Sequence, residues 1–352
     1  MSDFDIKSMT LPEVEEAFSE FNLPKYRAKQ VFDWLQVKCA FSYDEMSNVP
    51  KALREELKTA LPIYSCEIEL KQTSEIDGTV KYLFKLYDGN FIESVLMKYK
   101  YGYTLCVSSQ VGCKMGCVFC ASTKSGCVRN LYPSEILGQI HAAQRDMNIR
   151  VSHVVMMGMG EPLDNYKNTL RFLKLATDEK GLNLSMRNIS LSTCGIVPRI
   201  YDLLNEKLQL TLSVSLHAPN DEMRSRVMPV NKAYPIKELM QACKDYTKQT
   251  SRRISFEYAM IKDNNDSDAC AYELASLLKG MLCHVNLIPA NEINESAHKR
   301  STNERLNRFM SILNSRGINT TVRRSLGSDI DASCGQLRSR YNSEVKKKEG
   351  IQ

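Results

Sequence analysis

The stretch Cys113-Lys114-Met115-Gly116-Cys117-Val118-Phe119-Cys120 decides the fold, because it sets three cysteines in C-x₃-C-x₂-C spacing. Thiolates are soft ligands that select zinc or iron–sulfur clusters. A structural zinc ion takes four protein ligands, and the next cysteine downstream, Cys127, lies seven residues on. A zinc knuckle is therefore the alternative interpretation. Three thiolates on a four-iron cluster would instead leave one iron open.

An open iron can chelate the amino and carboxylate groups of S-adenosylmethionine (SAM) and pass it an electron. The cysteine spacing, after a predicted strand and before a predicted helix, is similar to the signature of the radical-SAM superfamily. This resemblance implies one [4Fe–4S] cluster held by Cys113, Cys117 and Cys120. The stretch 158–162, Gly-Met-Gly-Glu-Pro, resembles the glycine-rich segment that meets the SAM amino group in that superfamily.

Strand and helix patterns alternate through the rest of the chain, which predicts an α/β fold with a parallel sheet. Right-handed crossovers would curl six such units into a partial (β/α)6 barrel with its chemistry at the carboxyl ends of the strands. The clearest helical patterns are 133–147 and 165–177. The predicted strands are 104–109, 153–157, 189–193, 212–217, 253–260 and 285–289.

The chain divides by pattern into four parts. Residues 1–62 read as a small helical accessory domain, opened by a capping box at Thr10-Leu11-Pro12-Glu13. Residues 63–100 alternate as a connecting β-hairpin segment, with turns at 75–78 and 88–90. Residues 101–341 form the predicted barrel, and 342–352 a flexible basic tail.

Five long motifs resemble the RlmN/Cfr family of radical-SAM RNA adenine methyltransferases, and the resemblance covers nearly the whole chain. They stand at 106–113 (CVSSQVGC), 156–163 (MMGMGEPL), 192–198 (STCGIVP), 215–219 (SLHAP) and 331–337 (DASCGQL). Carbons 2 and 8 of adenine are not nucleophiles, so their methylation requires a radical route.

The resemblance implies roles for three further side chains. Cys334 would carry a methyl group, although Ser333 stands where alanine is common in the family. Cys106 would release the product by forming a disulfide with Cys334, and Glu93 would act as general base. The alternatives are a small buried hydrophobe for each cysteine and an exposed strand carboxylate for Glu93.

The resemblance also implies a SAM site at strand ends and the use of two SAM molecules per turnover. For His217, a hydrogen-bonded core histidine is the ordinary alternative. The predicted SAM contacts are Gly160, Glu161, Ser192, Ser215, Leu216, His217 and Asn291.

Pro162 and the stretch 287–291 favour the RlmN type, which methylates carbon 2, over the Cfr type, which methylates carbon 8 and confers ribosomal antibiotic resistance. The implied substrates are the adenosine at position 2503 of 23S ribosomal RNA, in the peptidyl-transferase centre, and adenosine 37 of tRNA. A third hypothesis, from another class, is a non-catalytic iron–sulfur or zinc RNA-binding protein.

A net charge of +6 permits a polyanionic partner. Twelve cysteines with no export signal favour reduced thiols in the cytoplasm, and no apolar run is long enough for a membrane span. We expect a monomer reduced by flavodoxin or a thiol-reducing system. The candidate RNA contacts are Lys98, Tyr99, Lys100, Tyr101, Tyr103, Arg252, Arg253, Arg323, Arg324, Arg338 and Arg340.

Overall fold

The computed structural model describes residues 5–124, 126–289, 300–330, 337 and 341. Its centre is a ten-stranded sheet in the order β1-β2-β3-β4-β7-β8-β9-β10-β11-β12, and β5 pairs with β6 in a separate small sheet. The strands are β1 (Glu67–Thr73), β2 (Val80–Lys85), β3 (Phe91–Tyr99), β4 (Gly102–Cys106), β5 (Gln110–Gly112), β6 (Cys127–Asn130), β7 (Val151–Met156), β8 (Ile189–Thr193), β9 (Thr211–Ser215), β10 (Ile254–Met260), β11 (Cys283–Pro289) and β12 (Thr320–Val322).

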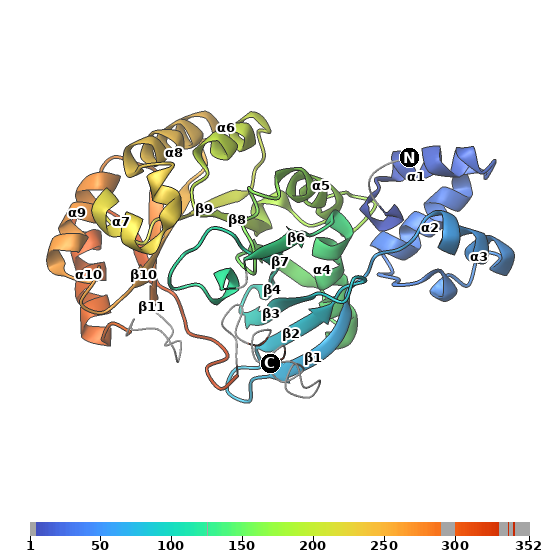
Figure 1. The fold of residues 1–352 in the computed structure, drawn as a ribbon, viewed down its shortest axis with the longest axis horizontal. Helices are drawn as coiled ribbons and strands as arrows, with labels where there is room; N and C mark the ends of the chain where they lie inside the picture. Colours follow the sequence, from blue (N-terminus) through green and yellow to red (C-terminus); the bar gives the residue numbers. More distant parts are fainter. Residues whose placement is uncertain (1–4, 125, 290–299, 331–336, 338–340, 342–352) are drawn as a thin grey trace.

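In the ten-stranded sheet, every pairing between neighbours from β4 to β12 is parallel. The sheet curls with its helices on the outside, and β1 and β12 stand at its two open edges (Figure 1). The α/β partial barrel expected from the sequence is therefore confirmed. The helices are α1 (Leu11–Glu20), α2 (Lys25–Gln36), α3 (Lys51–Ala60), α4 (Pro133–Met147), α5 (Tyr166–Ala176), α6 (Val197–Asn205), α7 (Asp221–Val227), α8 (Ile236–Thr250), α9 (Asp268–Leu278) and α10 (Asn303–Ser315).

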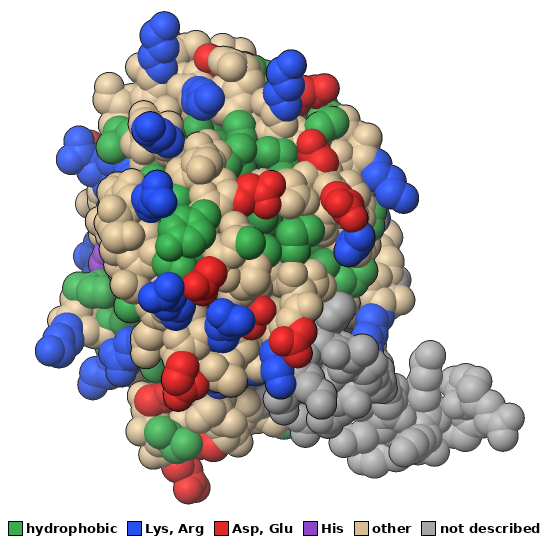
Figure 2. All heavy atoms as spheres, turned by 90° about the vertical axis from the view of Figure 1, so that its left-hand side faces the viewer, with side chains coloured by type: hydrophobic (Ala, Val, Ile, Leu, Met, Phe, Trp, Pro, Cys, Tyr) green, Lys and Arg blue, Asp and Glu red, His purple; other side chains and the backbone are tan. Residues whose placement is uncertain are grey.

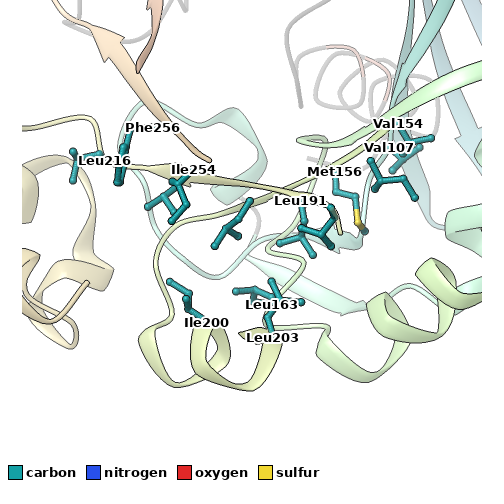
Figure 3. Packing of buried hydrophobic residues seen from close by; sticks show 14 of the residues in the cluster. Val107, Val154, Met156, Leu163, Leu191, Ile200, Leu203, Leu216, Ile254 and Phe256 are labelled. Atoms are coloured by element: carbon teal, nitrogen blue, oxygen red, sulfur yellow. The ribbon is translucent and has the colours of Figure 1, made fainter. Parts of the chain in front are cut away.

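The two faces of the sheet differ in polarity. On β8, Ile189, Leu191 and Thr193 are buried, whereas Ser190 and Ser192 between them are only partly buried. Since strand side chains alternate, the apolar set points outward to the helices and the serines point into the barrel. Figure 3 shows part of the outward layer, where residues from β7, β8 and β10 pack near α6. On β8 the interior face is thus the polar one.

The segment before the barrel forms three strands that extend the main sheet. β1 pairs with β2, β2 with β3, and β3 with β4, all antiparallel. The sequence predicted a connecting hairpin segment here. The structure adds that the segment has three strands and that the third, β3, hydrogen-bonds directly to the first barrel strand, β4. The division of the chain at residues 62, 100 and 341 stays a prediction.

The three N-terminal helices pack around a core of their own that includes Val14, Phe18 and Phe32. The predicted capping box is present, because both the amide and the hydroxyl of Thr10 donate to Glu13 Oε2 at 2.7 Å. The Ser134 hydroxyl donates to Asp5 at 2.6 Å and joins this helical unit to the start of α4.

Strand ends differ most from expectation at β4, which was predicted to reach residue 109 and ends at Cys106. The chain then bends toward the β7–α5 loop, where Ser109 N donates to Met159 O at 2.8 Å. The three-residue β12 was not predicted. In the described part of the chain, no helix has the length and apolarity to span a membrane.

Candidate active site

The three cysteines of the opening motif lie on a loop that is closed by its own small sheet. β5 and β6 pair antiparallel on either side of residues 113–126, and Cys113 N donates to Gly126 O at 2.9 Å. Gly112 has φ +83°, and a Cβ there would stand 2.0 Å from Gly126 O. Only glycine fits this position, so the closure of the loop depends on it.

The thiols of the loop lie near enough to influence one another. Burial raises the pKa of Cys113 and of Cys117 to about 12, and the Cys120 thiol adds to both rises. A metal centre must therefore displace the protons of these thiols when it binds. No three His, Cys, Asp or Glu side chains in the described ranges converge on a point that could hold a single metal ion. Three soft thiols on one loop fit a polynuclear cluster.

The cysteine loop packs against the carboxyl ends of the central strands. The Phe119 ring meets the His217 ring edge-on with centroids 4.7 Å apart, and Val118 N donates to Val227 O at 3.1 Å. Met115 and Cys117 also contact the apolar cluster around Cys194 and Met228. The loop therefore stands over β8 and β9, where the SAM contacts were predicted.

The glycine-rich stretch after β7 is held tightly against the chain after β4. Gly160 has φ +102°, and a Cβ there would lie 2.6 Å from Gln110 Cβ. The Gln110 side chain in turn accepts a hydrogen bond from Glu161 N at 2.9 Å. Substitution of Gly160 would strain the backbone and push the two segments apart.

Glu161 is buried and already serves the protein backbone. Its carboxylate accepts hydrogen bonds from Cys194 N at 2.7 Å and Leu163 N at 3.0 Å. Burial raises the pKa of the carboxyl, and these hydrogen bonds oppose the rise. The side chain thus ties the β7 loop to the β8 loop.

Ser192, Ser215, Leu216 and His217 lie at the ends of β8 and β9. Leu216 is fully buried, its amide donates to Glu257 O and its carbonyl accepts from Arg224, so its backbone is engaged within the protein. The His217 Nδ1 accepts from Ala259 N at 2.9 Å. Burial, then Arg224, lowers the His217 pKa to about 3. The ring is therefore neutral near pH 7, with its proton on Nε2.

Glu93 and Cys106 lie on the same face of the sheet. Cys106 stands opposite Val95 of β3 and Val155 of β7, and Glu93 is two residues from Val95 on the same side of its strand. Cys106 also packs with Val95, Met97 and Leu326. Glu93 is buried and its Oε2 lies 2.5 Å from Lys81 Nζ. The exposed strand carboxylate that was the alternative for Glu93 is therefore wrong.

Two predicted site residues, Cys334 and Asn291, lie outside the described residues, as do Arg338 and Arg340. No disulfide joins two of the cysteines that the structure describes. Cys127 is half-buried, and six cysteines outside the predicted site are buried, as free cysteines usually are: Cys39, Cys66, Cys194, Cys243, Cys270 and Cys283.

The sequence did not reveal three buried polar residues beside the site. Arg224 donates to Cys194 O at 2.6 Å, Ser215 O at 3.1 Å and Leu216 O at 3.2 Å, and so joins the β8 and β9 ends. Glu257 accepts from Asn286 at 2.8 Å inside the barrel. The signal for Glu257, and for Lys81, was a charge within an otherwise apolar strand.

Comparison with known proteins agrees with this geometry. The profile described as "Radical SAM superfamily" matches residues 107–275, and the profile of the "Ribosomal RNA large subunit methyltransferase N-terminal domain" matches residues 4–63. The chain is 50% identical to a "Probable dual-specificity RNA methyltransferase RlmN" from Thermoanaerobacter sp. over 97% of this chain and 99% of that one. A protein of the same description from Clostridium novyi is 50% identical, covering 96% and 98%.

A solved structure, a radical SAM methyltransferase from Sphaerobacter thermophilus, superposes with a TM-score of 0.91 at 46% identity, covering 95% of this chain and 98% of that one. Fold and site together define a radical-SAM methyltransferase. Within that class, the chain belongs to the RlmN family of RNA methyltransferases. A [4Fe–4S] cluster and SAM are the cofactors that this family implies.

Proposed function

We propose that this enzyme methylates carbon 2 of adenosine in RNA, at position 2503 of 23S ribosomal RNA and at adenosine 37 of tRNA. The relatives' description as dual-specificity RNA methyltransferases supports two RNA substrates. The observation that carries the proposal is the shared interior face of Cys106 and Glu93 on adjacent strands. A base that enters the barrel would meet a thiol and a carboxylate together.

Cys334 receives a methyl group and keeps it as a thioether. Cys113, Cys117 and Cys120 would hold the cluster, which with a further SAM would supply the radical chemistry that removes a hydrogen atom from that methyl group. After the methylene carbon has bonded to carbon 2, one electron would leave the adduct to the electron-transfer system, and Glu93 takes the proton that carbon 2 loses. Cys106 then attacks the Cys334 sulfur and forms a disulfide. The bond between that sulfur and the methylene carbon breaks, and the methylene group takes a proton and leaves as the methyl group of the base. A cellular reductant restores both thiols.

Nucleoside mass spectrometry of RNA from cells with and without the protein tests the position of the methyl group. We expect 2-methyladenosine only where the protein is present. A product with 8-methyladenosine and no 2-methyladenosine would identify the Cfr-type reaction instead. A non-catalytic RNA-binding protein would yield neither nucleoside, and no 5′-deoxyadenosine under reducing conditions.

The two cysteine roles can be separated by substitution. Cys334→Ala removes the methyl carrier, so the purified protein should lack the methylated cysteine peptide and form no product. Cys106→Ala leaves the carrier but no release step, so RNA should stay covalently attached to the protein. Cys283→Ala, at the start of β11, is the matched control and should keep activity. Equal activity of all three variants would exclude the S-methylcysteine route.

A further inference from the structure

Three aromatic rings meet at the turn between β3 and β4. The Tyr99 and Tyr101 rings are stacked with centroids 5.0 Å apart and planes 5° apart. The His153 ring of β7 meets Tyr101 nearly edge-on, with centroids 4.8 Å apart. Tyr101 is 61% exposed. An exposed tyrosine held in a fixed plane by two other rings presents a flat surface for a further ring.

This ring stack lies on the interior face of the sheet, at the amino-terminal end of β4. Tyr99, Met97 and Val95 alternate along the same face of β3, and Val95 stands opposite Cys106. His153 is two residues before Val155, which stands opposite Cys106 on the other side. Four residues of strand separate Tyr99 from Val95, or about 14 Å. The stack therefore lies on the same interior face as Cys106, toward the end opposite the cysteine loop.

The basic side chains near this turn do not all lie on the face of the ring stack. Lys98 lies on the other face of β3, where its Nζ is 5.9 Å from the centre of the Tyr103 ring. Burial raises the pKa of Tyr99, and the positive charges of Arg323 and Arg324 oppose the rise, so the electrostatic influence of both arginines reaches this ring. Flat rings combined with lysine and arginine are the chemistry that binds single-stranded nucleic acid, because rings stack on bases and cations meet phosphates.

The helical side of the molecule carries charges of both signs. Figure 2 shows that Lys and Arg side chains alternate with Asp and Glu over the side that carries α7, α9 and α10. A surface of mixed sign gives no continuous field for a phosphate backbone. The ring stack beside β3 and β4 is therefore the better candidate for contact with RNA.

We propose that Tyr99, Tyr101 and His153 form a stacking site for an unpaired base of the RNA substrate, adjacent to the adenosine that reaches Cys106. The inference rests on the proposed function and adds the direction of entry. A target base must leave its own stack to enter a barrel. When the target base leaves, the base next to it in the RNA loses a stacking partner. The Tyr101 ring would replace that partner.

The test uses the full-length, anaerobically purified holoenzyme and a hairpin RNA with the target adenosine in its loop. Fluorescent 2-aminopurine replaces the base next to the target, and its quenching reports stacking. In Tyr101→Ala we expect about tenfold weaker RNA binding, within the range for loss of one base stack, and loss of the quenching. Tyr101→Phe keeps the ring and should retain both. Tyr272→Ala, an exposed tyrosine on α9, is the matched control.

Salt dependence separates stacking from charge. Tyr101→Ala should keep the wild-type slope of log affinity against log salt, whereas Arg324→Gln should reduce it by about one phosphate contact. Wild-type affinity and quenching in Tyr101→Ala would overturn the stacking site. The exposed rings would then be a contact surface for a protein instead of RNA. Equal loss in Tyr101→Ala and Tyr101→Phe would also overturn it. In either case 2-methyladenosine formation by the wild-type enzyme would still establish the proposed function, and its absence despite normal binding and quenching would refute that function alone.

Discussion

Lys81 Nζ lies 2.5 Å from Glu93 Oε2, with the two side chains 0% and 2% exposed. The pair joins β2 to β3 on the face that also carries Cys106. A charge buried this completely is stable only beside its partner, because desolvation of an unpaired ion is costly. The proposed general base is therefore fixed in place by a lysine on the neighbouring strand.

Removal of Lys81 alone and removal of both charges should have different effects on stability. Lys81→Met leaves Glu93 buried without its cation and should lower the free energy of unfolding by about 3–5 kcal/mol, measured by chemical denaturation. The double variant Lys81→Met/Glu93→Gln should recover most of that loss. Lys85→Met, at the exposed end of the same strand, is the control. In the double variant the methyl group should still form on Cys334 but not pass to RNA. Stability of Lys81→Met equal to that of the control would contradict a structural ion pair.

Arg224 should control SAM affinity without touching SAM. Its guanidinium donates to carbonyls at the ends of β8 and β9, so Arg224→Met would leave those buried acceptors unsatisfied, at about 1–3 kcal/mol each. Equilibrium dialysis should then show weaker SAM binding. Arg224→Lys should not restore it, since an ammonium cannot reproduce the guanidinium fork. Arg226→Met, exposed on the same helix, is the control; SAM binding unchanged in Arg224→Met would refute this role.

Residues 323–330 should loosen when Asp329 changes. Its carboxylate accepts from Ser74 Oγ at 2.6 Å and Glu75 N at 2.8 Å, and Gly327 N donates to Asp77 at 2.8 Å. Asp329→Asn should therefore increase amide hydrogen exchange across 323–330, while Ser328→Ala should not. The Ser74 hydrogen bond lowers the Asp329 pKa below 3.8. Its contribution is complete above pH 3.8 and is lost as the pH falls further, so exchange in the wild type should rise only at strongly acidic pH.

His141 should make the protein sensitive to mild acid. Its side chain is fully buried on α4, and neither ring nitrogen has a hydrogen-bond partner among the described residues. Burial, then Lys7 and Arg145, lowers its pKa well below 6.5. Below pH 6.5, and above the lowered pKa of the folded state, the unfolded chain binds a proton that the folded chain does not. The free energy of unfolding therefore falls as the pH drops below 6.5. His141→Leu should flatten this dependence in denaturation measured from pH 7 to pH 5; an unchanged slope would show that His141 is not responsible.

Local signals in the sequence predicted local structure well. The strand 189–193 and the helix 133–147 have the predicted bounds. Alternating polarity marks the strand and Pro133 marks the first residue of the helix, and both signals lie within the element itself. β12 was missed because three residues are too few to show alternation. Lys81 and Arg224 were missed as well. Their burial depends on Glu93 and Cys194, 12 and 30 residues away in sequence, which only the tertiary fold brings close.

The hairpin of β5 and β6 has a consequence for how the enzyme matures. It ties residues 113–126 at their own base, so the entropy of closing that loop is already lost when the polypeptide folds. We expect the apoprotein to keep its barrel and to acquire iron and sulfide afterwards, without refolding. Loss of the cluster to oxygen would likewise inactivate the protein and leave a scaffold that the cell can reload.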